Sequence, residues 1–438
     1  MKKQYLLPTM AAMVCALSSG AAFAAEPPVF DTGDTAWMLT ATALVLMMTI
    51  PGLALFYGSL VRKENVLATM MQSFATCCIV SVLWVIIGYS LAFSEGSSFV
   101  GGMDRFLLAG MGLDSASGTI PESVFVMFQM TFAIITPALI YGAVADRMNF
   151  SAAVWFTSLW LIVVYAPVCH WVWGPGGFIG GTGLENYEGF LGLGTAIDFA
   201  GGTVVHINAG VAGLVAALVL GPRQGYRTGT QFMPHNLVLC VIGASLLWVG
   251  WFGFNAGSAV ASGDRAGMAM LVTQVATAAA ALAWMFAEWM KHGKPSVLGV
   301  CSGAVAGLVA ITPASGFVET PGALIIGVAA GVVCFWAASS LKKALKYDDS
   351  LDAFGIHGIG GMVGSILTGV LAVESVGGVA GSMDQMIAQI VASLTVALYS
   401  AVMTWFLLMV IKQFTKLRVD AEVEDSGLDL ALHGERVQ

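Results

Sequence analysis

The chain has 438 residues, of which 58% are hydrophobic and 10% are charged, and its mean hydropathy is +0.84. Soluble globular proteins carry about 25% charged residues, so this composition excludes an ordinary soluble protein. The net charge of −8 is scattered, and no basic patch with interleaved aromatic residues indicates nucleic-acid binding. Apolar runs of about 18 residues or more recur, and each can cross about 30 Å of hydrocarbon. The composition therefore predicts an all-α polytopic membrane protein.

The first 24 residues have the form of a secretory signal peptide. Lys2 and Lys3 provide the positive segment, an apolar stretch follows, and residues 22–24 read Ala-Phe-Ala, a small-x-small cleavage site. The alternative is an uncleaved additional membrane helix. With a cleaved leader, the membrane domain is expected over 25–412 and a cytoplasmic tail over 413–438.

Eleven membrane helices are expected in the remaining chain. They lie near residues 35–60, 66–93, 120–144, 150–173, 198–221, 235–260, 266–290, 296–314, 321–341, 352–373 and 385–412. Six cysteines fall inside these apolar runs and are expected as buried thiols, since their spacing is typical of neither a zinc site nor a disulfide framework. They are Cys77, Cys78, Cys169, Cys240, Cys301 and Cys334.

The distribution of basic residues gives each helix a direction. When the spans are connected alternately with the mature N-terminus outside, 14 of the 18 Lys and Arg residues fall in inside loops or the tail. Lys2 and Lys3 lie in the leader, and only Arg105 and Arg265 fall outside. The positive-inside rule therefore predicts eleven spans and a cytoplasmic C-terminus in the cell inner membrane.

Two of these apolar helices contain a histidine among small residues. They read "DFAGGTVVHINAGVAGLV" (198–215) and "GIHGIGGMVGSILTG" (355–369), with the histidines at His206 and His357. Each histidine is followed four and seven residues later by glycine, at Gly210, Gly213, Gly361 and Gly364. These offsets place the three positions on one helix face. Because the two helices run in opposite directions, the pattern predicts an inverted 5+5 repeat plus one extra helix, with the site between the halves.

An ionisable residue inside a membrane is a functional candidate, although a histidine can also serve packing alone. No lysine or arginine lies far inside a predicted span. Asp198 lies at a helix start, where it is expected either to cap the helix or to contact a substrate. The predicted lumen is therefore mostly apolar, with two neutral imidazoles.

Aromatic residues gather near the expected outer helix ends. Phe128, Phe132, Trp173 and Phe254 are candidates to line a vestibule there. Aromatic faces attract a small cation by about 0.5–2 kcal/mol. The alternative is that these rings are ordinary interfacial aromatics.

The two histidine segments resemble the ammonium transporter (Amt/Mep/Rh) family. The segment over 198–215 is similar to its characteristic motif, and "GWFGFNAGSA", "KPSVLGVCSGAVAGLV", "TPASG" and "DAFGIHGIGGMVGSILTG" are similar to its later segments. The likeness runs from about Ala36 into the tail, and it favours the bacterial Amt branch. It implies an eleven-helix homotrimer with one pore in each protomer.

The resemblance also implies roles at the outer end of the pore. Phe132, Trp173 and Ser258 would form the recruitment site for ammonium. Phe128 would cap that site, and Phe132 and Phe254 would stack below it as a gate.

Further in, the resemblance implies that His206 and His357 share a hydrogen bond between their rings in an apolar lumen. Asp198 would support ammonium entry, and Trp251 would lie close to the pore. No metal, cofactor or catalytic group is implied, so a transporter is expected and not an enzyme. A PII-type signal protein is an implied partner at the cytoplasmic face.

This constellation suits ammonium for a physical reason. NH4+ resembles K+ in charge and size, and a bare charge in a dry lumen costs many kcal/mol. Ammonium can give up a proton and cross as NH3, and neutral imidazoles then offer a donor and an acceptor. The residues fit two modes of transport. One is separate transfer of NH3 and H+, which we favour, and the other is simple NH3 flow.

Two alternatives remain at the level of sequence. One is an ammonium sensor with little flux; sensing members carry an appended signalling domain, and the chain ends about 26 residues after the last predicted helix. The other is a membrane protein that holds haem between His206 and His357. Proteins of that class usually carry more histidines, paired along one helix.

Overall fold

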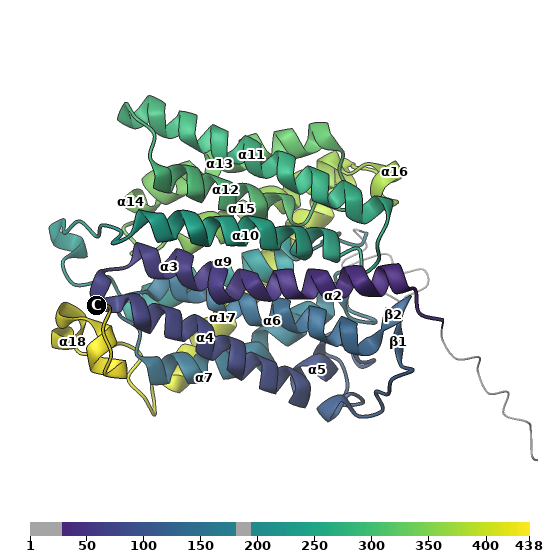
Figure 1. The fold of residues 1–438 in the computed structure, drawn as a ribbon, viewed down its shortest axis with the longest axis horizontal. Helices are drawn as coiled ribbons and strands as arrows, with labels where there is room; N and C mark the ends of the chain where they lie inside the picture. The colour runs from purple at the N-terminus through teal and green to yellow at the C-terminus, as the bar shows by residue number, and fades with distance from the viewer. Residues whose placement is uncertain (1–28, 181–193) are drawn as a thin grey trace, which may run out of the picture.

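The computed structural model describes residues 29–180 and 194–438 as a bundle of long helices (Figure 1). The predicted signal peptide over 1–24 lies outside the described residues. Within them, ten helical units are long and apolar enough to cross a membrane. These ten match ten of the eleven predicted spans, which confirms an all-α polytopic membrane protein.

The ten units are built from consecutive helical segments, some of them π-helical or 3₁₀ turns. They are α2 (Thr32–Met47), η1 (Met48–Leu53) and α3 (Ala54–Leu60); η2 (Lys63–Asn65), α4 (Val66–Leu83), η3 (Trp84–Gly88) and α5 (Tyr89–Phe93); α6 (Glu122–Val144); α7 (Phe150–Trp160), η5 (Leu161–Tyr165) and α8 (Ala166–Trp173); η7 (Gly202–Ile207) and α9 (Asn208–Leu220); α10 (Leu237–Gly257); α11 (Asp264–His292); α13 (Thr320–Trp336), η9 (Ala337–Leu341) and α14 (Lys342–Leu345); η10 (Phe354–Gly358) and α15 (Ile359–Leu371); and α17 (Met383–Ile411).

The eighth predicted span corresponds to α12 (Val297–Ile311), an apolar helix of 15 residues. At 1.5 Å per residue it is about 22 Å long, shorter than the hydrocarbon layer. The remaining described elements are short: η4 (Phe106–Leu108), β1 (Ala116–Ser117), β2 (Ile120–Pro121), η8 (Tyr226–Thr228), α16 (Glu374–Gly377), α18 (Ala421–Ser426) and η11 (Asp429–His433). The eleven-helix prediction is thus consistent with the structure.

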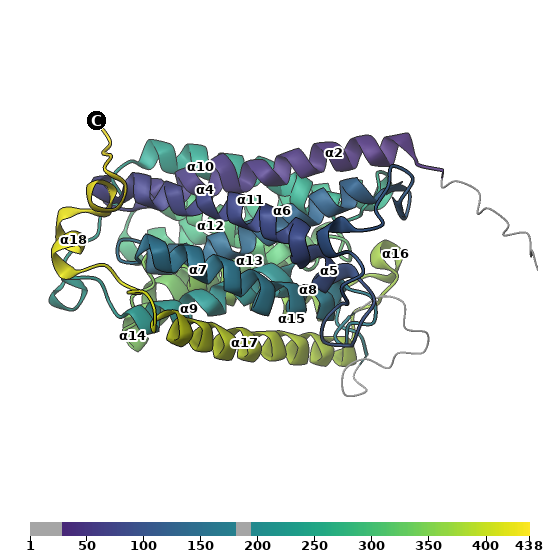
Figure 2. The same cartoon turned by 90° about the horizontal axis from the view of Figure 1, so that it is seen from below.

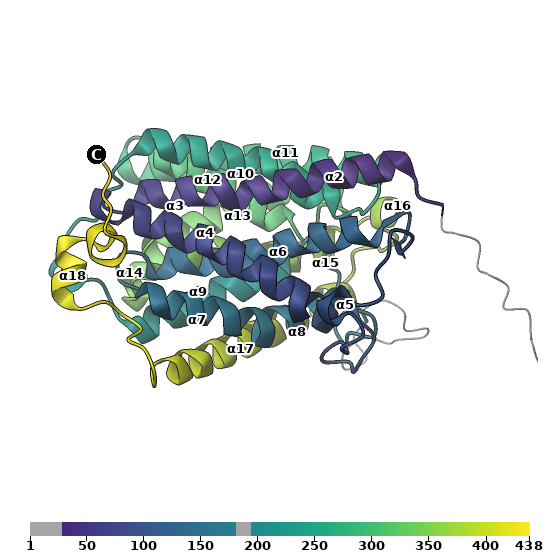
Figure 3. The ribbon, with the colours of Figure 1, turned by 60° about the horizontal axis from the view of Figure 1, so that its bottom comes forward.

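The long helices run along one common axis, so the bundle has two distinct ends (Figures 1 and 3). One end carries α14 and α18, and we name it the tail end. The opposite end carries α16 and the antiparallel pair β1–β2, and we name it the hairpin end. Helix α17 lies along one edge of the bundle (Figure 2).

Close helix packing in the middle of the bundle depends on glycine. A Cβ at Gly210 would lie 2.1 Å from the backbone nitrogen of Gly358, and a Cβ at Gly364 would lie 2.1 Å from the carbonyl oxygen of Ala310. Small residues permit such approaches in membranes, where helices gain no hydrophobic energy from contact. The histidine-bearing units η7–α9 and η10–α15 therefore touch backbone to backbone at Gly210, whereas Gly364 packs against α12. The contact between the two units is consistent with the inverted repeat.

Both histidine-bearing units begin with a π-helical turn, and both begin later than predicted. The first starts at Gly202 instead of residue 198, and the second starts at Phe354 instead of residue 352. Gly201, with φ of 108°, adopts a backbone conformation that glycine tolerates best, and it delays the first helix.

The helix ends at the tail end are held by buried arginines. The fully buried Arg147 donates to the carbonyls of Ala143, Gly221 and Asp348, at 3.1, 2.8 and 2.6 Å. Arg223 pairs with Asp348 at 2.8 Å. Carbonyls at helix C-termini lack partners inside the helix, so these guanidinium groups satisfy atoms that burial would otherwise leave unpaired.

One cysteine differs from its prediction. Cys78 of α4 is exposed, which corrects the expectation of a buried thiol there. Its place on the outer face of α4 explains this, because the face of a membrane helix that meets lipid needs only to be apolar.

The close approach at Gly210 predicts that adding one methyl group there will destabilise the protein. Gly210→Ala should lower the thermal stability of the detergent-solubilised protein, because overpacking costs about 1–3 kcal/mol. Gly267→Ala is the matched control, since a Cβ at Gly267 in α11 meets nothing within 4 Å. Melting followed by size-exclusion chromatography measures both, and equal melting temperatures would contradict the close crossing.

Candidate functional site

The two histidines meet in the interior of the bundle. Nδ1 of His206 lies 3.3 Å from Nδ1 of His357, and the rings stack with centroids 5.3 Å apart at 22°. Both residues are buried, at 1% and 3% exposure. For neutral rings, one Nδ1–H donates and the other Nδ1 accepts, so the two rings adopt different tautomers.

Aromatic rings continue the stack from His206 toward the hairpin end. The Trp251 ring lies 5.3 Å from the His206 ring at 22°, and the Phe254 ring lies 6.0 Å away. Trp251 is fixed because its Nε1–H donates to Thr312 Oγ1 at 2.9 Å. Nε2 of His206 is buried and has no partner among the described residues. One nitrogen of the pair is therefore free to bind a small guest.

Two phenylalanines stack next to the histidine pair, on its hairpin-end side. The rings of Phe132 and Phe254 have centroids 4.1 Å apart at an angle of 21°. Phe128 packs against Phe132 at 5.0 Å, and Trp173 meets Phe132 edge-on at 6.0 Å. Phe128, Phe132 and Phe254 are buried, at 0–1% exposure. The four aromatic residues predicted near one end thus form one cluster.

A cavity of about 620 Å³ opens above this cluster at the hairpin end. Phe132, Trp173, Asp198 and Ser258 are among its lining residues. The Ser258 hydroxyl donates to the Phe254 carbonyl at 2.8 Å, which leaves its lone pairs able to accept from a guest. The cavity wall thus combines aromatic faces with an oxygen acceptor.

Asp198 caps the first histidine-bearing unit. Its two carboxylate oxygens accept from the backbone N–H groups of Gly201, Gly202, Thr203 and Val204, at 2.9, 2.7, 2.8 and 3.1 Å. Its carbonyl accepts from Trp173 Nε1–H at 2.8 Å. Burial raises the pKa of the Asp198 carboxyl, although the four donors act in the opposite direction. The capping interpretation is confirmed, and the backbone carbonyl of the same residue holds Trp173.

Asp349 occupies the corresponding position in the second unit. It accepts from the N–H groups of Ala353 and Phe354, at 3.0 and 2.8 Å, and it precedes His357 by eight residues, as Asp198 precedes His206. Burial and the Asp352 carboxylate raise the pKa of Asp349 to about 6. Asp349 was not among the acidic residues expected at helix starts, which were Asp198 and Asp352. The equal spacing of eight residues was the signal that could have found Asp349.

Gln129 is a second residue that sequence reasoning missed. It lines the hairpin-end cavity beside Phe132, and its Oε1 has no partner among the described residues. Thr312 is a third, because its partner Trp251 lies 61 positions away in sequence. No local pattern marks either residue.

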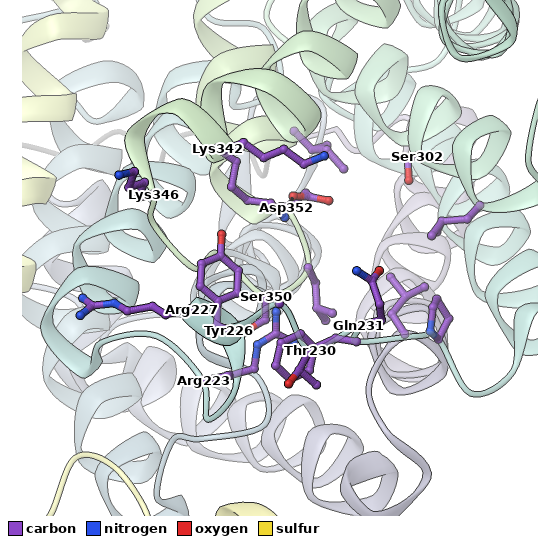
Figure 4. A pocket seen from close by; sticks show the side chains of 18 of the residues that line it. Arg223, Tyr226, Arg227, Thr230, Gln231, Ser302, Lys342, Lys346, Ser350 and Asp352 are labelled. Carbon is purple, nitrogen blue, oxygen red and sulfur yellow. Dashed lines mark hydrogen bonds and ion pairs between the residues drawn. The ribbon is translucent and has the colours of Figure 1, made fainter. Parts of the chain in front are cut away.

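A second cavity, of about 810 Å³, lies at the tail end and carries charged residues (Figure 4). Arg223, Lys342 and Asp352 line it, and Lys342 pairs with Asp352. Tyr226 lies nearby and donates to the Tyr347 carbonyl at 2.9 Å. Both cavities thus carry an ion pair, Lys342–Asp352 at the tail end and Arg105–Glu122 at the hairpin end, and the hairpin-end cavity adds the faces of Phe132 and Trp173.

The described residues contain no cluster of three or more His, Cys, Asp or Glu side chains that could hold a metal ion. The site combines aromatic rings, two imidazoles and oxygen acceptors, and Arg105, Glu122 and Asp198 also line its cavity. Such a set offers hydrogen bonds and cation–π contacts to a small polar guest.

The sequence of this chain matches a known protein family. The model of the Ammonium Transporter Family matches residues 36–438. This chain belongs to the ammonium transporter family. The chain is 47% identical over 431 residues to an ammonium transporter of Aquifex aeolicus, with 97% of each covered. It is 48% identical over 412 residues to one of Bacillus subtilis, covering 92% of this chain and 98% of that protein.

A solved structure agrees with these relatives. The crystal structure of Candida albicans Mep2 matches with a TM-score of 0.81 and 33% identity, covering 90% of this chain and 87% of Mep2. The expected family resemblance is thus confirmed, including relatives in bacteria. Members of this family are transport proteins, so the chain is not classed as an enzyme.

The carboxylate cap gives a prediction about stability. Asp198→Ala would leave four buried N–H groups without their acceptor, so it should lower the free energy of unfolding by at least about 2 kcal/mol. Ser382→Ala, which removes an exposed cap of α17 with a single N–H partner, should cost about 1 kcal/mol or less. Thermal melting of both variants in detergent measures the difference. A smaller loss for Asp198→Ala than for Ser382→Ala would contradict the capping role.

Proposed function

We propose that this protein transports ammonium by binding NH4+ at the hairpin end, removing its proton and conducting NH3 past His206 and His357. The observation that carries the proposal is the direct Nδ1–Nδ1 contact of 3.3 Å between these buried rings below the stacked phenylalanines. The names of the relatives support ammonium as the substrate.

The first step is recruitment in the hairpin-end cavity. The faces of Phe132 and Trp173 attract a small cation by about 0.5–2 kcal/mol. The free lone pairs of Ser258 accept an N–H from NH4+, and the unpaired Oε1 of Gln129 offers a further acceptor. Asp198 favours entry through its negative charge, while Phe128 supports Phe132 from the side.

The second step is exclusion of charge at the gate. Phe132 and Phe254 leave no polar partner in the stack, and a bare ion there loses its hydration at a cost of many kcal/mol. K+ has no means to reduce this cost. NH4+ can transfer a proton to the unpaired Nε2 of His206 and continue as NH3, so the gate selects by chemistry and not by size.

The third step is passage along the imidazoles. Neutral NH3 can donate to one ring nitrogen and accept from another, and the unpaired Nε2 of His206 offers such a position. The shared Nδ1 hydrogen bond joins the rings into one unit that can relay a proton. We favour separate transfer of NH3 and H+, which makes transport electrogenic.

The tail end is proposed to face the cytoplasm of a bacterial inner membrane. Arg147, Arg223 and Lys342 lie at that end, and such a bias follows the positive-inside rule. The homotrimer and the PII-type partner remain expectations from the family resemblance.

Current measurements on a solid-supported membrane test the proposal. Ammonium jumps should give a transient current in proteoliposomes, and potassium jumps should give none. A sensor with little flux would give no sustained uptake of methylammonium. A haem protein would show a visible absorption band after purification. Current for both ions would overturn the selectivity mechanism.

Removal of either imidazole should weaken ammonium transport. In His206→Ala and His357→Ala, the ammonium current should fall by about 10²-fold, the usual size of a lost proton-transfer group. His292→Ala, at the exposed C-terminal end of α11, is the matched control and should behave as the unaltered protein. Unchanged ammonium currents in both pore variants would remove the histidines from the mechanism.

Trp173 should affect binding more than passage. Trp173→Leu removes a cation–π face, so the half-saturating ammonium concentration should rise by about 3- to 30-fold while the maximal current changes less. Trp289→Leu, at a half-exposed position in α11, is the control. Concentration series of the ammonium current measure both, and an unshifted curve for Trp173→Leu would exclude it from recruitment.

A further inference from the structure

An ion pair that the proposed function leaves unused lines the hairpin-end cavity. Arg105 and Glu122 both belong to its wall, together with Trp173 and Ser258. Nε of Arg105 donates to Oε1 of Glu122 at 2.8 Å, and Nη2 of Arg105 donates to Oε2 at 3.1 Å. The guanidinium and the carboxylate thus meet through two parallel hydrogen bonds, a geometry that is stronger and more specific than a single contact.

The two partners come from different elements. Arg105 directly precedes η4, in the segment that connects α5 to β1, whereas Glu122 is the first residue of α6. The Glu122 side chain is 7% exposed, and the Arg105 side chain is 33% exposed. The carboxylate is therefore the buried member of the pair, and the guanidinium is the member that reaches water.

Contacts other than the ion pair also hold the carboxylate in the wall. Oε1 of Glu122 accepts from the Tyr89 hydroxyl at 3.1 Å, and the Glu122 backbone N–H donates to the Ser115 carbonyl at 2.8 Å. Glu122 lies in the first turn of a helix of 23 residues, where the helix dipole favours a negative charge. Loss of the guanidinium therefore leaves a carboxylate that is still held beside the cavity.

The pair contributes to the net charge of the cavity wall. Among the described residues, the charged members of this wall are Arg105, Glu122 and Asp198, with a formal net charge of −1. Removal of Arg105 makes the wall more negative by one unit, and removal of Glu122 makes it less negative by one unit. A cavity with low-dielectric walls focuses the field of its charges, so either change acts on a cation that enters.

We propose that the Arg105–Glu122 pair sets the affinity of the hairpin-end cavity for its cation, with Glu122 as an attracting charge that Arg105 offsets. This inference rests on the proposed function, because it assigns a further pair of residues to the recruitment of ammonium. Both residues lie in the cavity wall and outside the stack of aromatic rings and imidazoles. The pair therefore acts on the half-saturating concentration more than on the maximal current.

A purely structural role of the pair makes a different prediction. Nη1 of Arg105 also donates to the Ala109 carbonyl at 3.2 Å, and the Arg105 backbone N–H donates to Ser90 Oγ at 3.0 Å, so the residue holds the segment before β1 in place. If the pair served only this purpose, breaking it from either side would have the same effect, because the same bonds are lost. An electrostatic role predicts opposite effects from the two sides.

Ammonium currents from two neutral variants separate these roles. At low ionic strength, the half-saturating ammonium concentration should fall by about 3- to 10-fold in Arg105→Gln and rise by a similar factor in Glu122→Gln, the size expected for one unit charge a few ångströms away. Arg105→Lys keeps the positive charge and should shift the concentration less than Arg105→Gln. Asp384→Asn, which removes an exposed charge in the first turn of α17, is the matched control and should cause no shift. Shifts in the same direction for both neutral variants, or no shift in either, would overturn the proposal.

A binding measurement that needs no transport completes the test. Methylammonium chloride should raise the melting temperature of the detergent-solubilised protein relative to equal sodium chloride, because a ligand that binds the native state stabilises it. The rise should be larger in Arg105→Gln and smaller in Glu122→Gln. Both differences should shrink as the salt concentration increases from about 0.01 to 1 M, since the Debye length falls from about 30 to 3 Å.

The two measurements distinguish failure of this inference from failure of the proposed function. Opposite melting shifts in the two variants without any ammonium current would support the role of the pair in binding and overturn the proposed transport. Ammonium current together with equal melting shifts in both variants would support transport and overturn the role of the pair.

Discussion

The approach of two antiparallel helices at Gly210 determines where the imidazoles meet. A Cβ at this position would lie 2.1 Å from the Gly358 nitrogen, so only a glycine lets η7–α9 and η10–α15 touch backbone to backbone. Once the backbones touch, His206 and His357 have to share the small space between them, and their rings lie in direct contact. In a membrane, tight packing of small residues replaces the hydrophobic force that joins helices in water. The polar pair is therefore a product of apolar packing.

In a dry interior, the first N–H groups of each histidine-bearing helix also need hydrogen-bond acceptors, and Asp198 and Asp349 provide them. Backbone groups without partners are costly in hydrocarbon, and a helix that begins inside the bundle exposes its first N–H groups. Asp198 accepts from four of them and Asp349 from two, so both histidine-bearing units can begin beside the passage. The buried Arg147 does the same for carbonyls at the other helix ends.

Much of the fold was predictable because membrane helices reveal their length and direction in hydropathy and basic loops. The histidines could be paired in advance because each precedes the same two glycine positions. Thr312 and Gln129 could not be found this way, since their roles depend on partners distant in sequence or on the shape of a cavity. The helix starts were misplaced by two to four residues, because Gly201 and the aspartate caps delay the first turn. Asp349 was missed although its spacing to His357 repeats that of Asp198.

The matching aspartates also bear on the symmetry of the passage. Each histidine-bearing helix has a partial positive charge of about half a unit at its N-terminus, and each has a carboxylate on that terminus. Because the helices run in opposite directions, the two compensated termini flank the ring pair from opposite sides. The proposed passage therefore carries one compensated helix terminus on each side of the ring pair, while the cavities at its two mouths have different linings.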